Sequence, residues 1–417
     1  MSLVEHSSQI QSGLRLDRTH KVPVKSAESS TVSKRSSTIS GRARPVGKTL
    51  LVSDLSVFLF LLYFITKPIY LFPSGGPQIS DAFAFLALLL VAVEGKFELL
   101  PDFRKPVSAL TVFVVYTITV NVFWAVFVFD AKLLTKCLFY LYNLAIFVMF
   151  LHFAGKYQDR FLKLVALSLL ISVLGMVILS LAMPSLGGQR RVITFNNPNQ
   201  LAYWTLLSAC IFAACAHRVK IHFLLSVAFY LGILYVSFLS LSKAAMAATV
   251  ALLVMVFWRK PQILLVAVAC SVIVLVTVHD GAILDNLYQR VSHTQEDDNL
   301  IKRGYDLLWT YPEYLIFGSG EGAFERFSAV RSREFHSTLG TILFSYGIVG
   351  LAAFLLFVFR TWRAVGLFHF CLFIPPMLYG VAHQGLRFSL LWILFAAILI
   401  GRVEGSNTEA RIGSATT

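Results

Sequence analysis

Charged residues are scarce in this sequence. They make up 14% of the 417 residues, whereas hydrophobic residues make up 57%. A soluble globular domain contains about a quarter charged residues. A rich soluble core cannot account for this difference. The composition therefore excludes an ordinary soluble protein and indicates a chain whose main solvent is lipid.

Groups that could hold a metal are also few. The sequence has five cysteines, none at a metal-binding spacing, and its ten histidines form no ligand cluster and no His-Glu-x-x-His pattern. The cysteines lie inside apolar stretches, which favours neither a disulfide framework nor a redox site. We therefore expect no catalytic metal and no cofactor. The cysteines are Cys137, Cys210, Cys215, Cys270 and Cys371.

The formal net charge of +14 raises the question of a nucleic-acid partner. The basic residues, however, do not gather in one patch. Many of them stand at the ends of apolar runs, where the orientation of a membrane protein requires them. We expect membrane lipids as partners and no nucleic acid.

Long apolar runs predict an all-α fold, a polytopic bundle of transmembrane helices. Each crossing needs roughly 17–25 residues, and runs such as 263–278 do not alternate polar and apolar residues as barrel strands do. About twelve spans are expected. They are 49–66, 79–93, 107–128, 133–153, 161–183, 199–216, 221–240, 243–258, 263–278, 336–359, 364–381 and 385–401.

The distribution of Lys and Arg predicts that both termini lie in the cytoplasm. With the N-terminus inside, every inner connection is basic, as the positive-inside rule requires. The short outer connections are poor in Lys and Arg, with a few exceptions. The inner basic residues are Lys96, Arg104, Lys105, Lys156, Arg160, Arg218, Lys220, Arg259, Lys260, Arg360, Arg363 and Arg402.

The chain divides into five parts by composition. Residues 1–48 hold eleven Ser and nine Lys or Arg, which predicts a disordered basic cytoplasmic tail. Residues 49–278 contain nine spans, and 279–335 form one long periplasmic loop. Residues 336–401 contain the last three spans, and 402–417 form a short cytoplasmic tail.

The long loop has three recognisable segments. An acidic stretch, 296–298, reads as a solvated loop and not as a metal site. An amphipathic piece covers Leu300–Tyr311, and a Gly-rich turn follows at 317–322. Loops of this length usually have a function.

Five basic residues near the outer ends of spans are exceptions to the positive-inside rule. Ionisable residues at such positions usually serve a site. Several cations on one face indicate an anionic substrate, and guanidinium groups suit diphosphate oxygens. The alternative is that they anchor lipid headgroups. The residues are Arg190, Arg191, Lys243, Arg303 and Arg387.

Uncharged polar groups add to this pattern. His336 begins the tenth span and could act as a general base on a sugar hydroxyl, although a lone interfacial His is often only a hydrogen-bonding residue. His383 is a weaker candidate of the same kind. The segment Asn196–Gln200 predicts a turn that caps the sixth span. The amides of Asn197 and Asn199 could also bind a glycan.

Four segments, in this order, resemble the superfamily of O-antigen ligases and O-antigen polymerases, bacterial inner-membrane proteins. The family usually has Ser-x-Ser-Arg where Lys243 stands here, and Gly-Tyr-Gly where this chain has Phe-Gly-Ser-Gly. The resemblance covers roughly residues 190–355. The segments are 191–202, 240–243, Arg303 to Gly320, and His336 to Gly350.

The resemblance implies a metal-independent glycosyl transfer at the periplasmic face. The donor would be a glycan on undecaprenyl diphosphate, and the acceptor a sugar hydroxyl of a repeat unit or of lipid A–core. His336 would activate or orient the acceptor, while Arg191 and Arg303 would bind the diphosphate and stabilise the leaving group. Lys243 keeps the charge of the family's Arg but loses its bidentate fork.

Two questions stay open at the level of sequence. Ligase and polymerase share a donor and differ in the acceptor, and we favour a polymerase only slightly. A multi-span transporter or lipid flippase is the alternative from another class, because twelve spans are common among transporters. Against it, the candidate residues gather on one face and the long loop follows span nine.

Overall fold

The computed structural model describes residues 46–73, 76–95, 97, 99–183, 190–258, 303–327 and 334–401, together with 262, 265–266, 268–273, 285, 288, 292 and 301. The chain divides into two units, Met1–Val46 and Gly47–Thr417, and everything below except Val46 belongs to the second. The predicted tails 1–48 and 402–417 lie wholly or largely outside the described residues, and the predicted span 263–278 is described only at 265–266 and 268–273.

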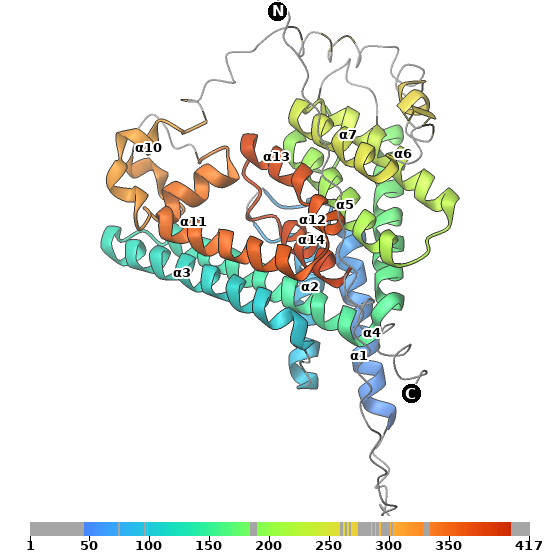
Figure 1. Ribbon diagram of the computed structural model, residues 1–417, viewed down its shortest axis with the longest axis horizontal. Coiled ribbons are helices and arrows are strands. Elements are labelled where there is room, and N and C mark those ends of the chain that lie inside the picture. The colour runs from blue at the N-terminus through green and yellow to red at the C-terminus, as the bar shows by residue number, and fades with distance from the viewer. Residues whose placement is uncertain are drawn as a thin grey trace, which may run out of the picture. The chain divides into compact units, whose positions relative to one another are not determined.

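Within the described residues the fold is all-α, without strands (Figure 1). Among these residues, five helices are long and apolar enough to cross a membrane, which indicates a membrane protein. The larger helices are α1 (Val46–Thr66), α2 (Ile79–Glu94), α3 (Arg104–Val128), α4 (Lys132–Ala182), α5 (Pro198–Arg218), α6 (Phe223–Ser240), α7 (Lys243–Phe257), α11 (Thr338–Ala364), α13 (Ile374–Ala382) and α14 (Ser389–Ile400).

Helix α4 covers two of the predicted spans, 133–153 and 161–183, without an interruption between them other than a kink. Gln158 has non-helical backbone angles, with φ 49° and ψ −130°. The rings of Phe150 and Phe161 on either side of it lie 5.2 Å apart. Eleven residues of straight helix would separate them by about 16 Å. The chain therefore bends sharply at Gln158, where sequence predicts an inner connection.

The last two predicted spans, 364–381 and 385–401, correspond to shorter helices. Helix α12 (Leu367–Cys371) precedes α13, and α14 has 12 residues. At 1.5 Å per residue α14 is about 18 Å long, less than the ~30 Å of a hydrocarbon layer. The twelve-span count therefore stays a prediction.

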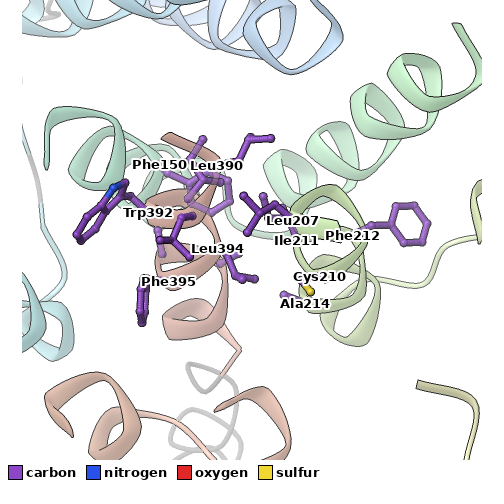
Figure 2. Close-up of a cluster of buried hydrophobic side chains, with 14 of the residues drawn as sticks. Phe150, Leu207, Cys210, Ile211, Phe212, Ala214, Leu390, Trp392, Leu394 and Phe395 are labelled. Carbon is purple, nitrogen blue, oxygen red and sulfur yellow. The ribbon is translucent and has the colours of Figure 1, made fainter. Parts of the chain in front are cut away.

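Helix α14 lies at the centre of the packing. All of its residues are buried, and it contacts α4, α5 and α11. Figure 2 shows its side chains, among them Trp392 and Leu394, in one apolar cluster with Leu207 and Ile211 of α5 and with Phe150 of α4. A helix that is apolar all round is stable when other helices or lipid cover it, and here helices cover it.

Contacts between connections fall into two groups. In one, Lys156 pairs with Glu94 at 2.9 Å, and Arg218 contacts both Asp159 (2.8 Å) and the carbonyl of Ile400 (2.7 Å). Sequence places all of these near the inner ends of spans.

In the other group, the Asn196 amide donates to the carbonyl of Phe72 at 3.0 Å, and Lys132 pairs with Glu325 at 3.0 Å. Sequence assigns these residues to outer connections. In both groups, therefore, each contact joins segments assigned to the same side.

The long loop is folded where it is described. Short helical turns, α10 (Leu307–Thr310), η3 (Pro312–Leu315) and η4 (Phe324–Arg326), surround a small aromatic cluster. Of the described residues in the amphipathic piece Leu300–Tyr311, only those of α10 are helical. Gly304 has φ +83°, a left-handed conformation that interrupts a right-handed helix just after Arg303.

Candidate functional site

Several predicted site residues converge on the end of α13 and the connection that follows it. The Tyr379 hydroxyl donates to the carbonyl of Asn199 at 2.8 Å. One guanidinium nitrogen of Arg303 donates to the carbonyl of Ala382 at 2.9 Å. The carbonyl of His383 accepts from the Thr338 hydroxyl at 3.1 Å. Segments far apart in sequence therefore meet at residues 379–383.

The Asn-rich turn has the capping role that sequence predicts. Asn197 is the N-cap of α5, and its side-chain oxygen accepts from the backbone N–H of Asn199 at 2.7 Å. Pro198 occupies the first turn. The side-chain oxygen of Asn199 accepts from Arg190 at 2.6 Å, and the Arg190 Nε donates to the carbonyl of Ser240 at 3.0 Å. The turn thus fixes Arg190 as well as the helix.

Arg191 and Lys243 lie on the same side of the bundle as Arg190. A guanidinium nitrogen of Arg191 donates to the carbonyl of Ser180 at 2.7 Å, and its backbone N–H donates to the carbonyl of Leu239 at 3.0 Å. Lys243 begins α7, shortly after Ser240. Neither Arg191 nor Lys243 forms an ion pair with any residue that the structure describes. Both charges are therefore uncompensated within this part of the chain.

His336 is exposed and lies directly beside Arg303. Its backbone N–H donates to the carbonyl of Arg303 at 3.2 Å. Ser337 then caps α11 by accepting from the N–H of Gly340 at 3.1 Å. The cap holds the start of α11 in place, so it also fixes the position of His336 relative to Arg303.

His383 lies deeper than His336. Its ring stacks on that of Tyr379, with centroids 4.5 Å apart, and Tyr379 in turn stacks on Tyr203 at 4.8 Å. This aromatic stack connects α13 to α5. His383 therefore has a packing role, independent of any role in binding or proton transfer.

Glu321 is the residue that sequence analysis missed. Its side chain is fully buried. One carboxylate oxygen accepts from the hydroxyls of Tyr140 (2.6 Å) and Tyr346 (2.9 Å). The other accepts from Gln384 (2.8 Å) and from Arg387 Nε (2.7 Å). These donors satisfy the carboxylate, which would otherwise be very costly to bury.

Arg387 belongs to this Glu321 network and not to the Arg190–Arg191 group. Besides Glu321 it contacts Glu334, with 2.8 Å between Nη2 and a carboxylate oxygen. Lys136 approaches the other oxygen of Glu334 at 3.4 Å. Two carboxylates therefore meet two cations, so the predicted substrate-binding role of Arg387 competes with a structural one.

The surroundings of Glu334 favour its charged form. Partial burial alone would raise the pKa of the Glu334 carboxyl. The charge and hydrogen bond of Arg387, helped by the charge of Lys136, outweigh burial and lower this pKa below its ordinary 4.5. Glu334 is therefore ionised at neutral pH.

Among the described residues, no group of three or more His, Cys, Asp or Glu side chains could hold a metal ion. The groups that gather near residues 379–387 are mainly guanidinium, imidazole, amide and phenol. Such groups can bind an anion and can donate or accept protons.

Two comparisons with known proteins found no relative. No family model matches the chain, and no curated protein matches it.

Proposed function

We propose that this chain is a bacterial inner-membrane glycosyltransferase of the O-antigen ligase or polymerase type. It would transfer a glycan from undecaprenyl diphosphate to a sugar hydroxyl at the periplasmic face, in the assembly of O-antigen or exopolysaccharide. The acceptor would be another repeat unit or lipid A–core, with the polymerase slightly favoured.

One observation carries the proposal. Asn199 and Arg303, which sequence singled out from separate segments, contact Tyr379 and Ala382, and His336 contacts Arg303. A mere set of headgroup anchors would have no need to converge on one short segment. Convergence is what a binding site requires.

The pattern of contacts between connections supports twelve spans with both termini inside. Arg190 contacts Ser240, and Asn196 contacts Phe72, all on the predicted outer side. Arg218 and Asp159 pair on the predicted inner side. On this topology the convergent residues lie at the periplasmic face, where lipid-linked glycans are presented and nucleotide sugars are absent.

The chemistry follows from the charges. The diphosphate departs readily when cations neutralise its developing charge. Arg191 and Lys243 carry charges that no described acid compensates. Arg303 donates to the carbonyl of Ala382, close to Tyr379, which contacts Asn199. His336, exposed beside Arg303, would orient or deprotonate the acceptor hydroxyl.

The test is a strain lacking the gene, complemented with wild type, His336→Ala or His222→Ala. His222 is a matched control, an exposed histidine that also lies just before a helix but at the predicted inner end. We expect His336→Ala to fail to restore glycan joining, and His222→Ala to restore it.

Size analysis of lipid-linked and surface glycans separates the alternatives. Single repeat units on a normal acceptor mean a lost polymerase, and long chains stranded on undecaprenyl diphosphate mean a lost ligase. Glycans unchanged by the deletion would contradict the enzyme proposal and favour a transporter or flippase.

A further inference from the structure

The turn Ile316–Gly320 of the long loop lies against the sides of α3 and α11 and not beyond their ends. The Tyr116 hydroxyl donates to the carbonyl of Phe317 at 2.9 Å, and the Trp124 indole donates to the carbonyl of Gly318 at 2.9 Å. Both donors are on α3. A loop that simply covered the bundle would not reach Tyr116.

Helices α3 and α11 pack side by side in opposite directions (Figure 1). Asn121 contacts Tyr346 at 3.3 Å, and the ring of Phe113 lies 5.4 Å from that of Phe354. Residue numbers fall along α3 as they rise along α11. The last turn of α3 is therefore level with the first turn of α11.

This register gives the depth of the turn. Trp124 lies about 6 Å along the helix axis from Val128, the end of α3, and Tyr116 about 18 Å, at 1.5 Å per residue. A hydrocarbon layer is ~30 Å thick. The turn Ile316–Gly320 therefore reaches well below the ends of the helices that flank it.

Non-helical backbone at such a depth is tolerated only when protein groups satisfy it. The N–H groups of Ser319 and Gly320 donate to the carbonyls of Phe344 (3.0 Å) and Ser345 (2.8 Å). Those two carbonyls are available because α11 is broken at Gly347, where φ is +67°. The broken helix and the turn thus complete each other's hydrogen bonds.

Glycine is required on both sides of this contact. A Cβ on Gly318 would lie 2.3 Å from the carbonyl oxygen of Ser345, and a Cβ on Gly347 would lie 2.2 Å from that of Ile316. Both glycines also have positive φ. The two backbones meet at a distance that excludes a side chain between them.

The outer surface of the turn is apolar. Ile316 is 56% exposed and Phe317 is 68% exposed. Ring contacts run from Tyr314 beside them to Trp124 (5.4 Å) and on to Phe123 (5.4 Å), a residue of α3 that is itself 56% exposed. The exposed apolar surface of α3 therefore continues onto the turn.

We infer that Ile316–Gly320 is a re-entrant turn whose exposed side chains, Ile316 and Phe317, contact lipid acyl chains. The partner is hydrocarbon of the leaflet on the C-terminal side of α3. A segment that hydropathy assigns to a water-exposed loop thus belongs to the membrane domain. The inference does not depend on the proposed reaction.

The test places a spin label at Ile316→Cys and at Phe317→Cys, in full-length protein carrying C270A and C371A and reconstituted into phosphatidylcholine vesicles. The other three cysteines are buried, which should protect them from the label in the folded protein. Collisions with oxygen report hydrocarbon, and collisions with a water-soluble nickel chelate report water. Phe123→Cys is the lipid control, and Ala131→Cys, exposed between α3 and α4, is the water control.

We expect both turn positions to match Phe123→Cys, with an oxygen-to-nickel ratio severalfold above that of Ala131→Cys. Two labelled positions guard against one variant that does not fold. A ratio at both positions equal to that of Ala131→Cys would overturn the inference and place the turn in water.

Discussion

Two groups of charges on the predicted outer side of this protein differ in how they are compensated. In the Glu321 network, each carboxylate meets Arg387, and Glu321 itself is fully buried. Around Arg191 and Lys243, no described acid forms an ion pair. A compensated charge holds a structure together, whereas an uncompensated one is available to an anion. The first group therefore holds the long loop to the helices, and the second is the better place for a diphosphate.

The largest expected effect comes from Glu321→Ala. It leaves Arg387 without its buried partner and two tyrosine hydroxyls without their acceptor. Breaking a buried ion pair costs about 3–5 kcal/mol of folding free energy. Arg387 keeps its contact with Glu334, so the loss should lie near the lower end of that range. The measurement is the free energy of unfolding in detergent.

Glu325→Ala is the control, because Glu325 pairs with exposed Lys132. The free energy of unfolding of Glu325→Ala should differ little from that of the wild type. If the two variants unfolded alike, the distinction between buried and exposed ion pairs in this loop would not hold.

The second effect concerns Gly347→Ala. The added methyl group would clash with the carbonyl of Ile316 at a backbone conformation with positive φ. We expect a loss of roughly 1–3 kcal/mol or more, and faster proteolysis of the 316–320 turn. Gly366→Ala is the matched control, since nothing lies within 4 Å of its Cβ. Equal behaviour of the two variants would argue against close backbone packing at the turn.

A third effect is on activity and not on stability. Arg191→Lys and Arg303→Lys keep the positive charge but lose the planar guanidinium, which can bind two oxygens at once. Each hydrogen bond to a charged group that is lost in this way removes about 1.5–3 kcal/mol of binding free energy. Glycan joining should fall about tenfold or more in each. Arg360→Lys, at an exposed site on the predicted inner side, should not change it. Mild and equal losses in all three would favour headgroup anchoring.

The smallest effect is a dependence on pH. The pKa of Glu334 is lower in the folded protein than its ordinary 4.5. Its contribution to stability is therefore present above that value and is lost as the pH falls through the folded pKa. Because Glu334 is half exposed, the loss should be small. Comparing acid unfolding of wild type and Glu334→Gln measures it, and identical profiles would contradict the assigned ion pair.

Hydropathy predicts where most helices lie because lipid imposes long apolar runs. Span 107–128 corresponds to α3, Arg104–Val128, and span 221–240 to α6, Phe223–Ser240. The cap at Asn197 was also predictable, because its hydrogen bond is local.

Glu321 was not predictable in this way. Its partners Tyr140 and Arg387 are 181 and 66 residues away in sequence. A carboxylate next to a Gly-rich turn is typical of a solvated loop. Sequence offered one indirect signal, Gly347 within an apolar span. The break of α11 there releases carbonyls that bind the turn preceding Glu321.

The most direct test of the account uses purified protein in lipid vesicles supplied with a glycan on undecaprenyl diphosphate and an acceptor, with joined product resolved by size. We predict product with wild type and with His222→Ala, and none with His336→Ala in spite of equal folding. Undiminished product with His336→Ala, or none with wild type on either acceptor class, would contradict the assignment of glycan joining to this site.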